Sequence, residues 1–371
     1  MKIINESLEE SQEVQFFLDS RDSLEGLKKI PFDNYQKAIV FCDQNLEKTW
    51  WKKIELILNN KILIDGLKFL EPNEQTKSLE YYRVLVNFLG EKKCSRDTLI
   101  IVIGGGTVLD AVAYLASTYM RGIPLMMIPT TLIGQADAST AGKTCINTSY
   151  SKNALGTLYL PKFVYNNVSI LKTNSSYELR QGFSEIFKYG LLGSKKLLTL
   201  LSEYSKDNDD TTLLEILSET IEVRMLLRKK DPLSSNLGHT FGHALEKISD
   251  YSVNHGDAIS VGMVMAMHFS IGEGILSHKL VEDITNSMTE LGLNTKISND
   301  VSPYELTQLM LTDKKSSNTE IRLVLIEGIA KPLKFKNSHF YSVDPEKMQS
   351  FLEAFNQKEE FVEASHWENL R

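Results

Sequence analysis

The sequence predicts an α/β protein whose N-terminal domain is built on a parallel sheet and whose C-terminal domain is mainly helical. Two short apolar runs have the continuous apolar character of buried parallel strands. The run at 37–43 ends in an aspartate, and the run at 98–106 ends in glycines. The second run is followed by a helix and a third strand, which indicates a βαβ unit. Further along, strand signals fade and helical periodicity dominates. We therefore expect an α/β domain over 1–170 and a helical domain over 171–371.

The individual elements follow from the same patterns. Strands are expected at KAIVFCD (37–43), TLIIVIGGG (98–106) and PLMMIPTT (124–131), with the helix TVLDAVAYLASTYM between the last two. Later helices are expected at 176–193, 213–229, 236–248 and 258–276, separated by turn residues. Segment 321–335 predicts a late strand pair or hairpin, and the last twenty residues predict a peripheral helix or tail.

Composition excludes several classes of protein. With 41 basic and 48 acidic residues the net charge is −7, so the basic excess of a nucleic-acid-binding protein is missing. No apolar run approaches the ~20 residues that cross a bilayer, and no apolar signal core follows Met1. We expect a soluble, cytoplasmic protein. Cys42, Cys94 and Cys145 are scattered and odd in number, which predicts buried small hydrophobes rather than disulfides or a zinc site.

The glycines at 104–106 predict a nucleotide site. Glycines between a strand and a helix let phosphate oxygens approach backbone N–H groups, and an acid that ends a neighbouring strand, here Asp43, can bind a ribose hydroxyl. GGGTVLD is not the GxGxxG fingerprint, however, and a tight turn is the alternative interpretation.

Histidines in the second domain predict a metal site. His239 and His243 in HTFGH lie four apart on one helix face and could bind a single ion. His255 follows in a loop, and Glu185 could supply an oxygen ligand. The alternative is that these histidines pack or cap helices.

The segment 137–153 is polar and rich in small residues, and it carries Lys143, Lys152 and Asn153. These features favour an ordered loop that binds a phosphate or a carboxylate. A solvated surface loop is the alternative, although apolar flanks on both sides favour partial shielding from solvent. Arg121 and DKK at 313–315 are further cationic candidates.

Together these segments resemble the 3-dehydroquinate synthase family of NAD-dependent sugar-phosphate cyclases. The resemblance covers most of 37–330 and is carried, in the family's order, by GGGTVLD, TYMRG, IPTTLIGQADASTAGKTCIN, SKNALG, GFSEIFKYG, NLGHTFGHALE, NHGDAISVGMVMA and DKK. It implies a Rossmann-like NAD domain, a helical metal- and substrate-binding domain, and a catalytic cleft between them. The implied reaction converts 3-deoxy-arabino-heptulosonate 7-phosphate to 3-dehydroquinate and phosphate, a step of the shikimate pathway. It proceeds through transient oxidation by NAD, phosphate elimination and an intramolecular aldol closure.

The resemblance also implies roles for single residues. NAD would be bound at its adenosine side by Asp43, Glu74 and Lys77, at its pyrophosphate by Gly105, Gly106 and Asp110, and elsewhere by Thr130, Thr131, Lys152 and Thr173. The divalent metal, zinc or cobalt, would be bound by Glu185, His239 and His255, with His243 as a substrate or proton-relay residue. The substrate phosphate would be bound by Lys143, Asn153, Lys314 or Lys315, and by Arg121 of a neighbouring subunit, which implies a homodimer. The remaining active-site residues would be Lys188, Asp137, Asn236 and Arg224.

One segment departs from the family pattern. Between Arg224 and Asn236 the chain is shorter than in members that make 3-dehydroquinate, and Pro232 replaces an arginine that binds the substrate carboxylate. One explanation is that Arg224 or the cluster Arg228–Lys230 supplies the missing charge. The other is that the substrate has no carboxylate, as for 2-deoxy-scyllo-inosose synthase or the sedoheptulose 7-phosphate cyclases.

AGKTCIN and NLGHTFGHALE favour the dehydroquinate branch. A metal-dependent polyol dehydrogenase of the glycerol dehydrogenase type is a further alternative. Such an enzyme would need neither the KTCIN and SKN segments nor DKK.

Overall fold

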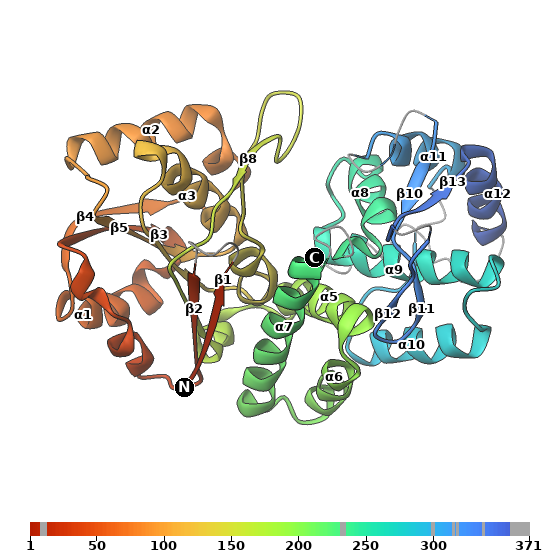
Figure 1. The fold of residues 1–371 in the computed structure, drawn as a ribbon, viewed down its shortest axis with the longest axis horizontal. Helices are drawn as coiled ribbons and strands as arrows, with labels where there is room; N and C mark the ends of the chain where they lie inside the picture. The colour runs from red at the N-terminus through yellow and green to blue at the C-terminus, as the bar shows by residue number, and fades with distance from the viewer. Residues whose placement is uncertain are drawn as a thin grey trace. The chain divides into compact units, whose positions relative to one another are not determined.

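The computed structural model describes residues 1–7, 13–230, 235–297, 301–313, 316, 319–335 and 338–356. The chain forms two compact units (Figure 1). Unit 1 comprises Met1–Ser175 and Leu213–Ser218, and unit 2 comprises Ser176–Thr212 and Glu219–Arg371. Among the helices of the described ranges, none has the length and apolar character that crossing a membrane requires.

Unit 1 is built on a seven-stranded sheet with the strand order β1-β2-β9-β6-β5-β3-β4. β1 pairs antiparallel with β2, and the other neighbours pair in parallel. The strands are β1 (Lys2–Ser7), β2 (Glu13–Asp19), β3 (Lys37–Asp43), β4 (Leu63–Leu70), β5 (Thr98–Gly104), β6 (Leu125–Pro129) and β9 (Phe163–Asn167). The three predicted strands are thus β3, β5 and β6, which lie side by side.

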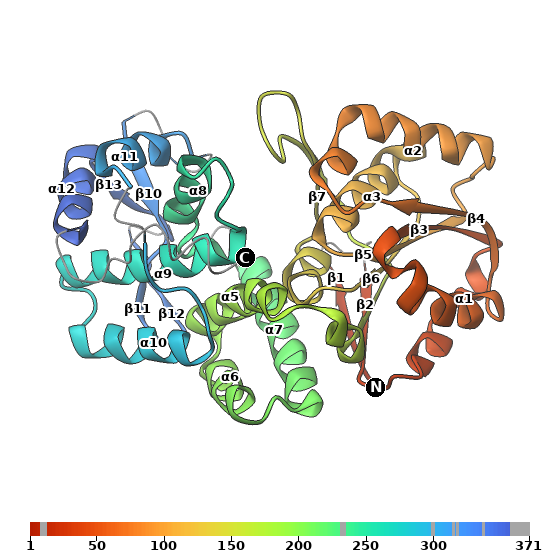
Figure 2. The same ribbon diagram turned by 180° about the vertical axis from the view of Figure 1, so that it is seen from behind.

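Helices cover both faces of this sheet. α1 (Lys52–Asn59) lies on one face, and α2 (Leu79–Glu91) and α3 (Gly106–Thr118) lie on the other (Figures 1 and 2). Val40 and Ile101 belong to one buried cluster that also contains Ile54 of α1. Every residue of β5 is buried. Because strands covered on both faces need apolar side chains in both directions, β3 and β5 are continuous apolar runs instead of alternating ones.

The segment predicted as a ligand-binding loop contains a hairpin. α4 (Ser139–Ala141) leads into β7 (Lys143–Ile146), which pairs antiparallel with β8 (Leu155–Leu158). The connection between the two strands projects from unit 1 (Figure 1). Most of its residues are exposed.

Unit 2 is mainly helical, as predicted. Its helices are α5 (Ser176–Gly193), α6 (Lys195–Asp207), α8 (His239–Ile248), α9 (His255–Gly272), α10 (His278–Glu290), α11 (Pro303–Leu311), α12 (Pro345–Asn356) and most of α7 (Asp210–Lys230). α9 is buried along nearly its whole length, and α5 and α8 pack against it. A helix that is apolar on all sides is expected at the centre of such a bundle.

The late strand prediction is only partly correct. β11 (Ile326–Gly328) and β12 (Lys331–Pro332) form a hairpin inside 321–335. β10 (Ile321–Leu323) instead pairs with β13 (Tyr341–Val343), beyond the predicted segment. The predicted terminal helix ends at Asn356, and the rest of the predicted tail, 357–371, lies outside the described residues. The fold class itself, a parallel-sheet domain followed by a helical domain, is confirmed.

Candidate active site

Three side chains of unit 2 converge as a group that could hold a metal ion. Glu185 of α5, His239 of α8 and His255 of α9 each offer a ligand atom, and these atoms lie within 4.8 Å of one another. Oε1 of Glu185 is 3.6 Å from Nε2 of His239 and 3.2 Å from Nε2 of His255. Glu185 is fully buried, and the side chain of His255 is 37% exposed. One carboxylate and two imidazoles match the donors that zinc prefers and leave coordination positions open.

Glu185 is brought to His255 by a close approach of α5 to the start of α9. Gln181 Oε1 accepts a hydrogen bond of 2.6 Å from the backbone N–H of Gly256, and Gln181 Nε2 donates one of 3.1 Å to Asp257. A Cβ atom on Gly256 would lie 2.5 Å from the Cα of Gln181, so only glycine allows this contact. Glu185 follows Gln181 by one helical turn and therefore faces the same helix.

His239 is brought to His255 by a similarly close crossing of α8 and α9. Gly238 has φ +76°, and a Cβ there would lie 2.7 Å from the backbone nitrogen of Met263. A Cβ on Gly262 would lie 2.2 Å from the carbonyl oxygen of Gly238. The glycines of NLGHT and SVGM thus allow the start of α8 to pack closely against the middle of α9.

Each histidine of this group is held through its Nδ1 atom, which directs Nε2 towards Glu185. Nδ1 of His239 lies 3.1 Å from the carbonyl oxygen of Leu237, and Nδ1 of His255 lies 3.5 Å from a carboxylate oxygen of Glu246. Such partners fix the ring orientation of metal-binding histidines. Burial lowers the pKa of His255, but the hydrogen bonds to Glu185 and Glu246 outweigh it and raise the pKa to about 10.

Two further predicted residues lie beside this group. The ammonium of Lys188 contacts Glu185 one turn earlier on α5. The ring centre of His243 is 5.4 Å from that of His239, and its Nδ1 lies 2.8 Å from Oδ2 of Asp313. Spacing alone would pair His239 with His243 on one ion, whereas the structure groups His239 with His255 and Glu185.

Arg224 lies on α7, where its side chain is buried. Its guanidinium carbon is 5.4 Å from the centre of the Tyr189 ring, and Lys188 Nζ is 4.4 Å from the same ring. Asn236 lies in the turn before α8. The shortened segment at 231–234, with Pro232, and the predicted cations Lys314 and Lys315 lie outside the described residues.

In unit 1 the predicted nucleotide residues gather at the carboxyl ends of the central strands. Gly105 is the N-cap of α3 and Gly106 is its first residue, directly after β5. Asp43 ends the neighbouring β3, and its side chain accepts a hydrogen bond from the backbone of Asn45. Thr130 follows β6 and donates its backbone N–H to Gly104. Ligands of open α/β sheets bind at this edge.

Lys77 connects several of the predicted residues. Its Nζ is 2.8 Å from the carboxylate of Asp110, 2.6 Å from Oδ1 of Asn153 and 3.5 Å from Sγ of Cys145. Glu74 accepts a hydrogen bond of 2.6 Å from Asn147 in the same region. Burial lowers the pKa of Lys77, but the interactions with Asp110, Cys145 and Glu74 together outweigh burial and raise it. Asn153, expected at the substrate phosphate, thus lies against a lysine expected at NAD.

The three cysteine thiols differ in burial, although all three were expected to be buried. Cys42 and Cys94 are buried, as predicted, but Cys145 is only partly buried and lies 3.2 Å from Asp110. Burial, reinforced by the Asp110 charge, raises the pKa of the Cys145 thiol to about 12. The prediction of three buried hydrophobic thiols is therefore wrong for Cys145, because the β7–β8 hairpin places it among polar groups.

The expectation that the 137–153 segment shields its lysines is also wrong. Lys143 is exposed at the start of β7, and Lys152 is exposed in the projecting connection. The first apolar flank is buried in β6 and the turn after it, whereas Leu155 and Leu158 of the second flank are themselves exposed on β8.

The other predicted residues of unit 1 lie in turns. Asp137 is half-buried in the turn Gly134–Ala138, and Arg121 is exposed with φ +67°. Thr131 Oγ1 accepts a hydrogen bond from the backbone of Gly134, and Thr173 donates one to the carbonyl of Ile170.

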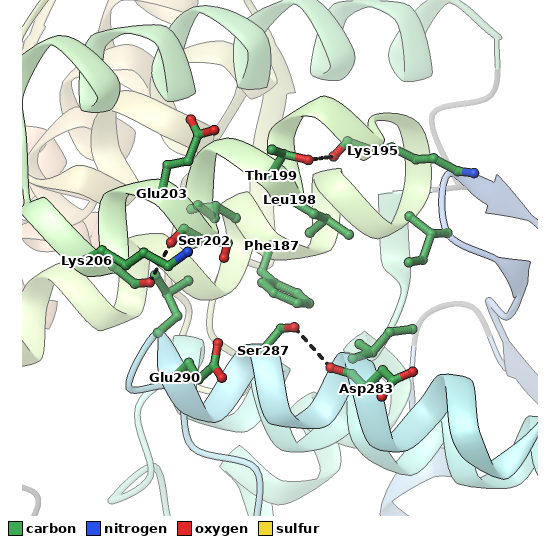
Figure 3. Close-up of a pocket in the computed structure, with 15 residues that line it drawn as sticks. Phe187, Lys195, Leu198, Thr199, Ser202, Glu203, Lys206, Asp283, Ser287 and Glu290 are labelled. Atoms are coloured by element: carbon green, nitrogen blue, oxygen red, sulfur yellow. Dashed lines mark hydrogen bonds between the residues drawn. The ribbon is translucent and has the colours of Figure 1, made fainter.

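A pocket of about 500 Å³ lies elsewhere in unit 2, between α6 and α10 (Figure 3). Phe187, Thr199, Ser202, Ser287 and Glu290 are among the residues that line it. None of the predicted site residues lines this pocket. This pocket therefore shares no residue with the candidate active site.

Sequence reasoning missed the residues that hold the predicted ones in place: Gln181, Tyr189, Glu246 and Asp313. Each has a simple signal. Gln181 precedes Glu185 by one turn, Tyr189 follows Lys188, Glu246 lies one turn after His243, and Asp313 begins DKK. A search for polar or aromatic residues one turn from each candidate would have found the first three.

Comparison with known proteins agrees with this geometry. The model of the 3-dehydroquinate synthase N-terminal domain matches residues 68–181, and that of the C-terminal domain matches 182–316. A 3-dehydroquinate synthase of Francisella tularensis subsp. tularensis (strain WY96-3418) is 35% identical over 282 residues, which cover 72% of this chain and 79% of that protein.

Solved structures show the same fold at lower identity. A 2-deoxy-scyllo-inosose synthase, complexed with carbaglucose-6-phosphate, NAD⁺ and Co²⁺, has a TM-score of 0.82 and 20% identity, covering 94% of this chain and 98% of that one. A 2-epi-5-epi-valiolone synthase from Streptomyces hygroscopicus subsp. jinggangensis 5008, with NAD⁺ and Zn²⁺ bound, has a TM-score of 0.80 and 21% identity, with the same coverage.

Proposed function

We propose that this chain, which belongs to the 3-dehydroquinate synthase family, converts 3-deoxy-arabino-heptulosonate 7-phosphate to 3-dehydroquinate and phosphate. The observation that carries the proposal is the convergence of Glu185, His239 and His255 in a chain 35% identical to a 3-dehydroquinate synthase over most of its length. Lys188 and His243 lie beside these three residues.

The residues present fit a divalent metal and NAD. In unit 2, the carboxylate of Glu185 and the Nε2 atoms of His239 and His255 would hold zinc or cobalt. In unit 1, Gly106 leaves space over the first turn of α3, since a Cβ there would meet nothing closer than 3.9 Å, whereas a Cβ on Gly105 would lie 3.1 Å from Thr131. The pyrophosphate of NAD would bind there, at the positive end of the helix. Asp43, at the end of β3, would accept a hydrogen bond from a ribose hydroxyl.

In this mechanism the bound cofactors supply reversible hydride acceptance and acidification of a substrate hydroxyl, so the net redox change is zero. A temporary ketone makes the neighbouring C–H acidic, which allows phosphate to leave. The chain's own residues bind and move protons. His243 relays a proton beside the metal ligands, and the Lys188 ammonium stabilises negative charge that develops on substrate oxygens. Ring opening and an intramolecular aldol closure complete the reaction.

The carboxylated substrate is supported by Arg224. This guanidinium is buried against the Tyr189 ring, which the Lys188 ammonium also contacts. Arginine binds a carboxylate through two parallel hydrogen bonds. We therefore infer that Arg224 replaces the family arginine whose position Pro232 occupies.

A second candidate is the cyclisation of a neutral sugar phosphate, and the shortened segment before Asn236 favours it. A substrate without a carboxylate would not need the missing arginine.

We further propose that the chain works as a homodimer in which Arg121 reaches the phosphate site of a second copy. Arg121 is exposed, and Met120 and Arg121 both adopt positive φ angles of 48° and 67°. Such backbone is costly for residues other than glycine and is retained where a side chain must be presented. Unit 1 would bind NAD, and unit 2 would bind the metal and the sugar.

A phosphate-release assay tests the function. The full chain, with NAD and zinc, is offered 3-deoxy-arabino-heptulosonate 7-phosphate, glucose 6-phosphate and sedoheptulose 7-phosphate. The first should be fastest by at least about tenfold in kcat/KM. If glucose 6-phosphate or sedoheptulose 7-phosphate, which lack a carboxylate, reacts faster, the chain is assigned as a cyclase of a neutral sugar phosphate instead of a dehydroquinate synthase. Phosphate release from none of the three would refute both.

A further inference from the structure

Asp313 is a buried carboxylate held against a half-exposed histidine. It lies two residues after the end of α11, and its side chain is 4% exposed. Its Oδ2 atom is 2.8 Å from Nδ1 of His243, whose side chain is 38% exposed. One nitrogen of the imidazole is therefore anchored inside the protein while the ring remains accessible.

This contact decides which nitrogen of His243 carries the proton. If the Asp313 carboxylate is ionised it can only accept a hydrogen bond, and Nδ1 is then the donor. In a neutral imidazole Nε2 is then unprotonated and can accept a proton. We propose that Asp313 is a positioning residue that holds His243 in the Nδ1–H tautomer, with Nε2 ready to take a proton from the substrate.

The surroundings of His243 distinguish it from the two metal-binding histidines. Nδ1 of His239 faces the carbonyl of Leu237, whereas Nδ1 of His243 faces the side-chain carboxyl group of Asp313. The His243 ring centre lies 5.4 Å from that of His239 and 6.3 Å from that of His255. A proton acceptor at this place would serve a substrate hydroxyl bound at the metal. A carboxylate that holds a histidine in the required tautomer is a recurrent arrangement in acid–base catalysis.

A purely structural role is the competing explanation, since Asp313 also joins the end of α11 to α8. The structure offers a second bond that does the same. Lys247 Nζ donates a hydrogen bond of 2.8 Å to Oγ1 of Thr312. Lys247 lies one helical turn after His243, and Thr312 immediately precedes Asp313. Thr312→Val removes that bond without touching His243 and is therefore the matched control.

The inference rests on the proposed function for its kinetic part only, and the tautomer can be measured without substrate. The zinc-loaded full chain is labelled with ¹⁵N-histidine, and the His243 signals are identified by their loss in His243→Gln. We expect Nδ1 to be protonated in the wild type. In Asp313→Asn the new side chain both donates and accepts, so the two tautomers should mix. An Nε2–H tautomer of His243 in the wild type would overturn the proposal.

Kinetics provide the second measurement. In Asp313→Asn, kcat for phosphate release should fall about 10²-fold, while KM and bound zinc change by less than about twofold. Thr312→Val should match the wild type in all three. Wild-type kcat in Asp313→Asn would overturn the proposal. If no sugar releases phosphate but His243 shows the Nδ1–H tautomer, the proposed function fails and the assignment of Asp313 is supported.

Discussion

The ring of Tyr189 lies 5.4 Å from the guanidinium carbon of Arg224. The same ring lies 4.4 Å from the ammonium of Lys188, so one buried aromatic side chain contacts two cations on two different helices. Cation–π contacts of this kind gain strength where water is excluded. The arrangement holds a planar cation on the ring that also contacts Lys188, the lysine beside Glu185, and a carboxylated substrate as proposed would use this cation as its partner.

Arg224→Ala should therefore remove the preference for a carboxylated substrate. Loss of a bidentate partner for a partly desolvated carboxylate costs a few kcal/mol, which corresponds to about 10²-fold in kcat/KM for 3-deoxy-arabino-heptulosonate 7-phosphate. The rate with sedoheptulose 7-phosphate should stay within about threefold. Steady-state kinetics with the two sugars measure the difference.

Arg180→Ala is the control, because Arg180 also stacks on an aromatic ring, that of Tyr177, at 5.5 Å. It should leave the preference unchanged. An equal loss with both sugars in Arg224→Ala would mean that Arg224 supports the fold of unit 2 rather than the substrate carboxylate.

Metal content should depend on His239 and His255 but not on His243. His239→Ala or His255→Ala removes one of the three proposed ligands and should reduce bound zinc well below one per chain. His243→Ala should keep the metal and lower turnover, because its Nδ1 is held by Asp313 and its ring lies outside the group of three. Elemental analysis of the purified variants decides this. A metal-free His243→Ala together with a fully loaded His255→Ala would reverse the assignment.

A strand could be predicted from the sequence where the residues that determine it are close together in the chain. β3, β5 and β6 were predictable because a strand covered on both faces must be apolar throughout. β9 was not, since its sequence FVYNN contains Asn166 and Asn167, which are fully buried yet polar. Their side chains bond to the backbone at Gln135 and Arg21, residues distant in sequence. No local pattern carries that information.

The site shows the same division. Glu185, His239 and His255 could be named because each sits in a distinctive motif. The contact between His243 and Asp313 joins residues 70 apart and exists only once α11 has packed beside α8. Exposure of Lys143 likewise depends on a hairpin that projects from its unit, and polar composition alone did not reveal this.

NAD should be required for phosphate release but not consumed. The oxidation is needed only to acidify a neighbouring C–H, and the hydride returns to the same carbon. Absorbance at the NADH band should show no net growth over many turnovers. Phosphate release without added or bound NAD would contradict the mechanism. NADH that accumulates in step with substrate loss would instead identify a polyol dehydrogenase, and that enzyme would release no phosphate.

Cys145 should be an unusually slow thiol, because burial and the nearby Asp110 charge both disfavour its thiolate. Burial and the Asp110 charge raise its pKa to about 12, so only about 10⁻⁴ of it is thiolate at pH 8. The thiolate is the reactive form. Alkylation by iodoacetamide should therefore rise about tenfold per pH unit from pH 8 to pH 11, where an ordinary thiol has already levelled off.

Asp110→Asn separates this electrostatic cause from burial. The substitution removes the negative charge 3.2 Å from Cys145 Sγ but keeps the Lys77 ammonium, which lies 3.5 Å from the same sulfur. The pKa of Cys145 should therefore fall, and its alkylation at pH 8 should become several-fold faster. Cys94, distant from this carboxylate, is the internal control and should react as in the wild type. If NAD contacts Lys77 and Asp110, as the family resemblance implies, it should slow alkylation of Cys145 and leave the alkylation of Cys94 unchanged. Peptide mass spectrometry after timed alkylation reads both sites in one sample, and equal acceleration of both thiols in Asp110→Asn would show unfolding of unit 1 instead.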